Sequence, residues 1–368
     1  MVPKMPRRLS SSILLSLMNN VDARKYFQKA IVQSSPFGMH YRKPNEATEE
    51  AETLYDKLDC KDGRNDENFE RMIDCAMSRS ADEIVEAAAK VRGIIDRDLL
   101  VSVFEAWTPV IDNILIDRHP LNAFYDGVSD DKVLMTGHTT GEGSVFIYSI
   151  FANEMGKTAY QSAIGLLFGD DKQEILRQYP SNCRTIDRHC DMRPQLSRIA
   201  GSYLFDCPMR KAISNRAKVG GTTPNKTFYY LFDHPLAIDG IPDEAISVCE
   251  KTSCHGAELP FMFETFEDLD IQLRDVEVSL ALKMGNYWSN FAWNSNPNRS
   301  DDIQERPQGM NCWQEWSDFS TDTCGEGVNY DPFTMVHLKT GEFENDVDPD
   351  GVMSDCDFWD ELDSYLEH

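Results

Sequence analysis

The sequence predicts an α/β protein with a mostly parallel central sheet covered by helices. Short apolar runs of strand type alternate along the chain with longer helical segments, an order that is typical of parallel sheets. These runs lead into small or polar residues, as buried strands do where they enter a loop. With 368 residues and 41% hydrophobic side chains, the chain can bury a large core.

Buried strands are expected at 29–34, 131–137 and 225–233. A short extended piece is expected at 107–112, and a final edge strand at 333–339. In open parallel sheets, ligands and catalytic side chains lie beyond the carboxyl ends of the strands. The loops that follow these runs are therefore where a site is expected.

Helices are expected where apolar residues recur at helical spacing, as they do from Ile13 to Val21. A basic stretch before this segment weakly imitates a signal peptide, but its apolar part is interrupted, so a domain helix is favoured. The expected helices are 10–28, 45–58, 66–78, 81–92, 269–292 and 354–366, with further helical segments up to about residue 218.

Composition excludes some classes of function. The net charge of −26 disfavours nucleic acid and anionic membranes as partners, and mainly confers solubility. No apolar run approaches the length of a membrane-spanning helix. No cofactor and no metal centre are expected, and the sequence leaves the oligomeric state open.

The chain has ten cysteines, most of them in short-range pairs. An even number with local pairing is typical of disulfides formed in the secretory pathway, and no pair has the spacing of a zinc knuckle. The expected disulfides are Cys60–Cys75, Cys183–Cys190, Cys249–Cys254 and Cys312–Cys324, with Cys207–Cys356 closing a long loop. Glycosylation sequons at Asn225 and Asn298 agree with a secreted or extracellular protein.

An acidic loop is expected at 341–355. From residue 341 onward there are eleven acidic residues and no Lys or Arg. Asp346, Asp348, Asp350 and Gly351 resemble the first half of a calcium loop, but the twelfth position is Asp357 instead of Glu, and the preceding segment is not helical in pattern. A solvated loop is therefore favoured over calcium binding.

Two motifs carry chemistry. His255 lies in a tight turn between Cys254 and the apolar run 259–263, and Glu142 lies in the sequence Gly-Glu-Gly-Ser after a predicted strand. Histidine is the side chain best matched to proton transfer near neutral pH. A carboxylate partner orients its ring and stabilises the imidazolium. The two motifs together predict an acid–base pair.

Together with their neighbours, these motifs resemble the C-terminal two-thirds of a type-B carboxylesterase of the cholinesterase-like branch. The resemblance covers a single partial domain at 9–366, and residues 1–8 do not fit it. Five landmarks carry it: Ala30–Ser34, Pro109–Asp112, Gly141–Ser144, Cys254–Pro260 and Cys356–Trp359. The resemblance implies an incomplete α/β-hydrolase fold that lacks its N-terminal strands.

The resemblance also implies roles for single residues. Glu142 is the catalytic acid that orients the imidazole, and His255 is the general base. Ser34 is a supporting group near the acid, while Phe37 and Gly38 lie near the acyl pocket. Cys60–Cys75 and Cys207–Cys356 match disulfides of the family, and Cys249–Cys254 would staple the loop that carries His255.

The chain departs from the family at the nucleophile. No Gly-x-Ser-x-Gly elbow occurs in the sequence, and Met5, Arg7 and Leu9 stand where its Gly, Ser and Gly would be. The Gly-rich loop that supplies most of the oxyanion hole is also missing. Without both, covalent acyl transfer is not available. The missing strands would leave an uncovered apolar sheet edge.

Three hypotheses follow. The first is a carboxylic-ester hydrolase that acts on small-molecule esters through an acyl-enzyme, whose sequence is truncated here and is expected to be inactive as given. The alternative is a non-catalytic, cholinesterase-like adhesion or binding protein. Retention of both Glu142 and His255 argues against that alternative, because a binding module needs neither. The third is a product without a stable fold.

Overall fold

The computed structural model describes residues 27–61, 68–91, 107–125, 132–181, 190–219, 226–236, 247–266, 272–298, 312–316, 335–340, 344–346 and 355–362. The helix expected at 10–28 lies outside the described residues, except that residues 27 and 28 are not helical and lead into the first strand.

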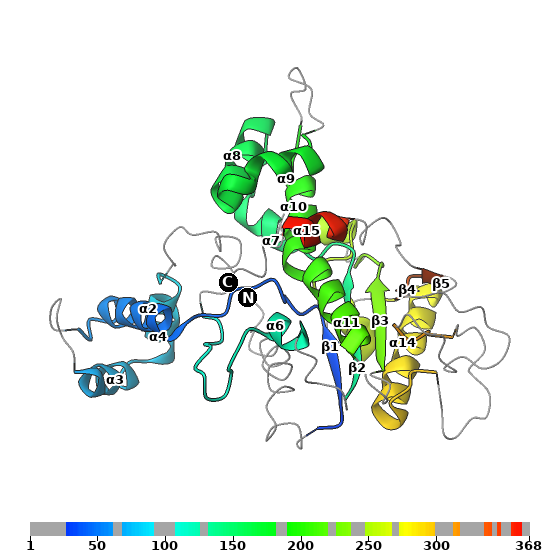
Figure 1. Cartoon of the computed structure of the whole chain (residues 1–368), viewed down its shortest axis with the longest axis horizontal. Coiled ribbons are helices and arrows are strands. Elements are labelled where there is room, and N and C mark those ends of the chain that lie inside the picture. The colour runs from blue at the N-terminus through cyan, green and yellow to red at the C-terminus, as the bar shows by residue number, and fades with distance from the viewer. Residues whose placement is uncertain are drawn as a thin grey trace.

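A five-stranded sheet in sequential order forms the centre of the described structure (Figure 1). Its strands are β1 (Lys29–Gln33), β2 (Val133–Thr139), β3 (Thr227–Phe232), β4 (Met335–Leu338) and β5 (Glu344–Asp346). The first four are parallel, and β5 runs antiparallel to β4. The predicted α/β class with a mostly parallel sheet is confirmed.

Two expectations about the C-terminal region are wrong. The strand predicted at 333–339 is not the edge of the sheet, because β5 pairs with the outer side of β4. The acidic loop predicted at 341–355 accordingly contains a strand. The open edge of β4 needs backbone partners, and the backbone of residues 344–346 supplies them whatever their side chains.

Helices cover both faces of the sheet. Alternating side chains of β3 serve both sides: Tyr229 and Leu231 join one core cluster, and Phe228, Tyr230 and Phe232 join the other. All six residues of β3 are buried, as expected for a strand whose residues after Thr227 are all aromatic or apolar.

The first core cluster lies under α6 (Pro120–Tyr125), α7 (Ser144–Ile150), α8 (Lys157–Phe168), α9 (Lys172–Gln178), α10 (Arg193–Gly201), α11 (Cys207–Val219) and α15 (Asp355–Leu362). The second lies under α13 (Leu259–Phe263) and α14 (Asp275–Asn294). The long helix α14, predicted to start at residue 269, begins at Asp275. Residues 272–274 are not helical, and the Arg274 backbone N–H is capped by the Glu277 carboxylate.

A small lobe carries three of the described helices between β1 and β2, while α6 packs on the main core. It consists of α2 (Pro44–Lys57), α3 (Phe69–Met77) and α4 (Ala81–Ala88), and Figure 1 shows it to one side of the sheet. Its own small core centres on Leu58, Cys60 and Ala87. Among the described ranges, no helix combines the length and the apolar character needed to cross a bilayer.

Candidate active site

Glu142 stands directly beyond the carboxyl end of β2. The strand ends at Thr139, and a turn leads into α7, which begins at Ser144. The turn is locked to the loop of His255 by a parallel bridge between Gly141 and Cys254, in which the Gly141 N–H donates to the Ser253 carbonyl at 2.9 Å. Two segments more than a hundred residues apart are thereby held together by backbone pairing.

The Glu142 carboxylate is buried and fully engaged. One oxygen accepts hydrogen bonds from the Ser34 hydroxyl at 2.6 Å and the Thr139 N–H at 2.7 Å, and the other contacts Nδ1 of His255. Burial alone would raise its pKa. The charge of His255 and these hydrogen bonds outweigh burial and lower the pKa of Glu142 to about 2. The group is therefore an anion throughout the neutral range.

Ser34 is brought to Glu142 by the end of β1. Its backbone takes a left-handed conformation with a φ of 50°, and its N–H donates to the Gly137 carbonyl of β2 at 2.8 Å. The kink turns the chain out of the strand while the Ser34 hydroxyl donates to Glu142. The structure thus brings together all three residues that the sequence predicts at this position.

The imidazole of His255 lies in an aromatic setting. Its ring is 4.9 Å from that of Phe205 and 5.1 Å from that of Phe146, and only 5% of the side chain is exposed. On one side the loop is closed by the Cys249–Cys254 disulfide, and on the other Gly256 adopts a φ of 84°. The loop therefore has little freedom to turn the ring away from Glu142.

The arrangement fixes the chemistry available to the histidine. Because Glu142 is ionised, the Nδ1 of His255 that faces it carries the proton. Nε2 is then the basic nitrogen, able to accept a proton and later return it. This is the geometry of a general base with its orienting acid.

The residues predicted near an acyl pocket have a structural place in the core. Phe37 is buried and packs edge-to-face on Phe124, with ring centroids 5.7 Å apart. Gly38 lies against a π-helical turn at Ser202–Asp206, where a Cβ would come within 2.3 Å of the Tyr203 carbonyl oxygen. Their role in substrate binding stays a prediction.

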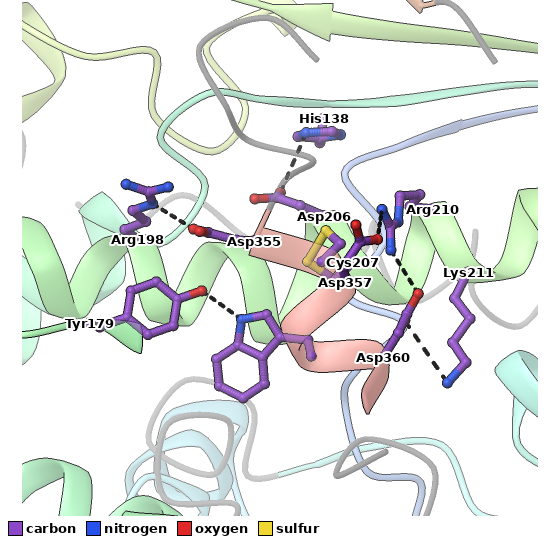
Figure 2. Close-up of a disulfide and its surroundings, with 12 residues drawn as sticks. His138, Tyr179, Arg198, Asp206, Cys207, Arg210, Lys211, Asp355, Asp357 and Asp360 are labelled. Atoms are coloured by element: carbon purple, nitrogen blue, oxygen red, sulfur yellow. Dashed lines mark hydrogen bonds and ion pairs between the residues drawn. A yellow bond between two sulfur atoms is a disulfide. The ribbon is translucent and has the colours of Figure 1, made fainter. Parts of the chain in front are cut away.

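Three of the predicted disulfides are present: Cys60–Cys75, Cys207–Cys356 and Cys249–Cys254. Figure 2 shows the one that ties the start of α11 to α15. Cys190 and Cys312 are also disulfide-bonded. Their predicted partners, Cys183 and Cys324, lie outside the described residues.

The predicted glycan and calcium positions are partly described. Asn225 lies outside the described residues. Asn298 pairs with the backbone of Trp313 through both ends of its side-chain amide, at 2.7 Å each. A glycan on its nitrogen would have to leave this contact intact, and its glycosylation stays a prediction.

Of the calcium-like segment, Asp346 lies in β5, and the positions 348, 350 and 351 are not described. Asp357, at the twelfth position, forms an ion pair with Arg210 at 2.8 Å. No cluster of three or more His, Cys, Asp or Glu side chains that could hold a metal occurs within the described ranges.

Sequence reasoning missed one group of polar residues beside the site. His138, Tyr229 and Asp206 lie in the core next to Glu142, and all three are buried. The only available signal was a histidine inside the buried strand β2. Nothing local indicated that Asp206 would face it from a helix.

Known proteins resemble this chain over most of its length. A sequence profile described as the carboxylesterase family matches residues 10–339. The chain is 31% identical over 282 residues to the cAMP-regulated D2 protein of Dictyostelium discoideum, covering 76% of this chain and 49% of that protein. It is 29% identical over 279 residues to the crystal protein of the same organism, covering 75% and 47%.

Acetylcholinesterase 1 of Caenorhabditis briggsae is 25% identical over 319 residues, covering 80% of this chain and 48% of that protein. The chain thus spans about half the length of these relatives. The matched profile covers most of the chain, and the parallel sheet flanked by helices is that of an α/β-hydrolase. The chain belongs to the carboxylesterase family.

Proposed function

We propose that this chain supplies the acid–base pair of a serine-type carboxylic-ester hydrolase. His255 takes the proton of an attacking serine and later protonates the leaving alcohol, while Glu142 holds the ring and balances its charge. The observation that supports this most is the contact between the buried Glu142 carboxylate and Nδ1 of His255 at the carboxyl edge of the sheet.

The nucleophile and the oxyanion hole must come from outside these residues. No Gly-x-Ser-x-Gly elbow occurs in the 368 residues, so the chain by itself lacks the serine that His255 would activate. We therefore expect the chain alone to be inactive, and a protein extended by its upstream coding sequence to hydrolyse small-molecule esters.

We place the protein in the secretory pathway or outside the cell. The three disulfides support this, because such bonds persist in oxidising compartments. Mass spectrometry of the secreted protein would test this expectation together with glycan occupancy at Asn225 and Asn298.

The test of the enzymatic proposal has two arms. A chromogenic short-chain ester is offered to the chain alone and to the protein extended by its upstream sequence. We expect turnover only from the extended protein, together with a Gly-x-Ser-x-Gly elbow in the added segment. Authentic upstream sequence without an elbow would sink the proposal and favour a binding protein of the same fold.

A further inference from the structure

A chain of buried polar groups runs through the core beside the candidate dyad. His138 projects from β2, with its Nδ1 2.7 Å from the hydroxyl of Tyr229 on the neighbouring strand β3. Its Nε2 faces Oδ1 of Asp206 at 3.6 Å, as Figure 2 shows. All three side chains are buried, so solvent does not screen the electrostatic interactions among them.

Asp206 reaches this position from an irregular turn. Residues 202–206 form a π-helical turn between α10 and α11, and every one of them is buried. Such wide turns are uncommon and are frequent at functional sites. Here successive residues contact the two histidines beside Glu142: Phe205 packs on His255, and Asp206 faces His138.

Asp206 and Glu142 are two buried acids in one small space. A Cβ on Gly201 would lie 3.6 Å from Oδ2 of Asp206 and 3.7 Å from Cβ of Glu142. Both groups border the same glycine, and the charge of Glu142 disfavours ionisation of Asp206. Glu142 accepts hydrogen bonds from two neutral donors and faces His255, so the negative charge belongs on Glu142.

The charges around Asp206 also favour its neutral form. Burial, followed by the charges of Glu142 and Asp355, raises the pKa of Asp206 well above its ordinary value. Asp355 is itself paired with Arg198 at 2.6 Å. Burial lowers the pKa of His138 to about 4, although Glu142 opposes this.

Tyr229 closes the chain in the same uncharged form. Burial is the main cause that raises its pKa. In the described part of the chain, neither Oδ1 of Asp206 nor Nε2 of His138 has a hydrogen-bond partner. The two atoms face each other. A proton on one of these two atoms would point toward the other, and a small approach of the two side chains would close a hydrogen bond between them.

We propose that Asp206 is a positioning residue of the dyad: it retains its proton, faces His138 as a neutral acid, and leaves Glu142 as the single buried anion that orients His255. An ionised Asp206 would repel the charge on Glu142 and draw a proton onto His138. The protonation of Asp206 is inferred independently of the proposed function, and only the catalytic role of Glu142 and His255 rests on it.

Infrared difference spectroscopy on the whole chain at pH 7 tests the proton directly. Exposed carboxyl groups are ionised at this pH, so a protonated carboxyl stretch reports a buried neutral acid. We expect this band in the wild type and its loss in Asp206→Asn. The matched control Asp233→Asn removes a partly exposed carboxyl whose pKa is lowered, and should leave the band unchanged. A band that survives Asp206→Asn, or is absent from the wild type, overturns the proposal.

Thermal unfolding gives a second readout with a definite sign. A folded state that protonates Asp206 loses stability as the pH rises above the ordinary pKa of aspartate. Asp206→Asn should therefore raise Tm at pH 7 relative to the wild type, with the gain shrinking as the pH falls toward 4. A lowered Tm whose deficit grows with pH would show that Asp206 is ionised.

The link to the dyad is tested in Glu142→Gln, which also serves if Asp206→Asn fails to fold. Without the anion, Asp206 should ionise more easily, so its infrared band should titrate at a lower pH than in the wild type. An unchanged midpoint overturns the coupling. None of these measurements uses a substrate, so a failed esterase assay on the extended protein would leave their outcome standing.

Discussion

Two buried carboxylate–histidine pairs in this molecule look alike and differ in what they can do. One is Glu142 with His255, and the other is Glu277 with His234. In both pairs neither side chain is more than 6% exposed. Burial would raise the pKa of both carboxyls, yet their partners lower each pKa to about 2. Burial, charge and proximity therefore do not distinguish a base from a structural pair.

The difference lies in which nitrogen is bound and in what else shares the carboxylate. Glu277 receives Nε2 of His234 at 3.1 Å, and it also accepts from the side chain and backbone of Arg274 at 2.6 and 2.7 Å. It caps the first turn of α14, with its charge balanced by arginine. Glu142 binds Nδ1 of His255, and the Ser34 hydroxyl and the Thr139 N–H that also donate to it are neutral. This second arrangement leaves Nε2 of His255 as the basic nitrogen, as the proposed role needs.

The largest expected difference between the pairs is in catalysis. In the protein extended by its upstream sequence, His255→Ala should lower kcat/KM for a chromogenic ester by about 10⁶-fold, because the serine loses its base. His234→Ala should leave kcat/KM per folded molecule nearly unchanged, since that pair belongs to a helix cap. Equal losses in the two variants would contradict the comparison.

Acid stability should separate the pairs next. The pKa of Glu142 falls from 4.5 to about 2 on folding. The resulting stabilisation is present above pH 4.5 and is lost as the pH falls from 4.5 through 2. It amounts to about 3 kcal/mol. Glu142→Gln should therefore cost most at pH 7 and converge with the wild type near pH 2, as followed by denaturant unfolding at several pH values.

Glu277→Gln is the matched control. Its main ion-pair partner, Arg274, is largely exposed, so solvent screens that interaction. We expect the same direction of pH dependence with a smaller amplitude. A larger amplitude for Glu277→Gln than for Glu142→Gln would show that the arginine, and not burial, controls acid stability.

Only one of these pairs could be read from the sequence. Glu142 and His255 stand in compact motifs in loops that follow buried strands. Strand burial leaves a clear apolar pattern in the sequence, as in β3. The Glu277 pair leaves almost none. Its cap is Arg274, which is not a residue type that marks helix starts, so the predicted helix began too early.

Features that depend on contacts between distant segments could also not be predicted from the sequence. β5 consists of Glu, Asn and Asp, which carry no strand signal, and it forms because β4 offers an open edge. Asp206 meets His138 through a π-helical turn, which has no sequence signature in this segment. The sequence therefore predicted the elements that local pattern determines, and not those determined by the neighbouring backbone.

The smallest expected effects come from a glycine next to Glu142 and from a glycine in α14, the helix that Glu277 caps. A Cβ on Gly143, beside Glu142, would come within 2.1 Å of the Ser197 carbonyl oxygen, so α7 and α10 would have to move apart. Gly143→Ala should lower the free energy of unfolding by about 1–3 kcal/mol. Gly285 lies within α14, and its Cβ would meet only Oε1 of Glu264, at 3.8 Å.

Gly285→Ala should instead stabilise the chain by up to about 1 kcal/mol, because alanine favours a helix interior that has room for it. Urea unfolding of both variants at pH 7 measures the contrast. Opposite signs would mean that the backbone around Glu142 is packed too closely for a single added carbon, while the helix of the structural pair tolerates one. Matching signs would remove close packing as a reason why Glu142 stays aligned with His255.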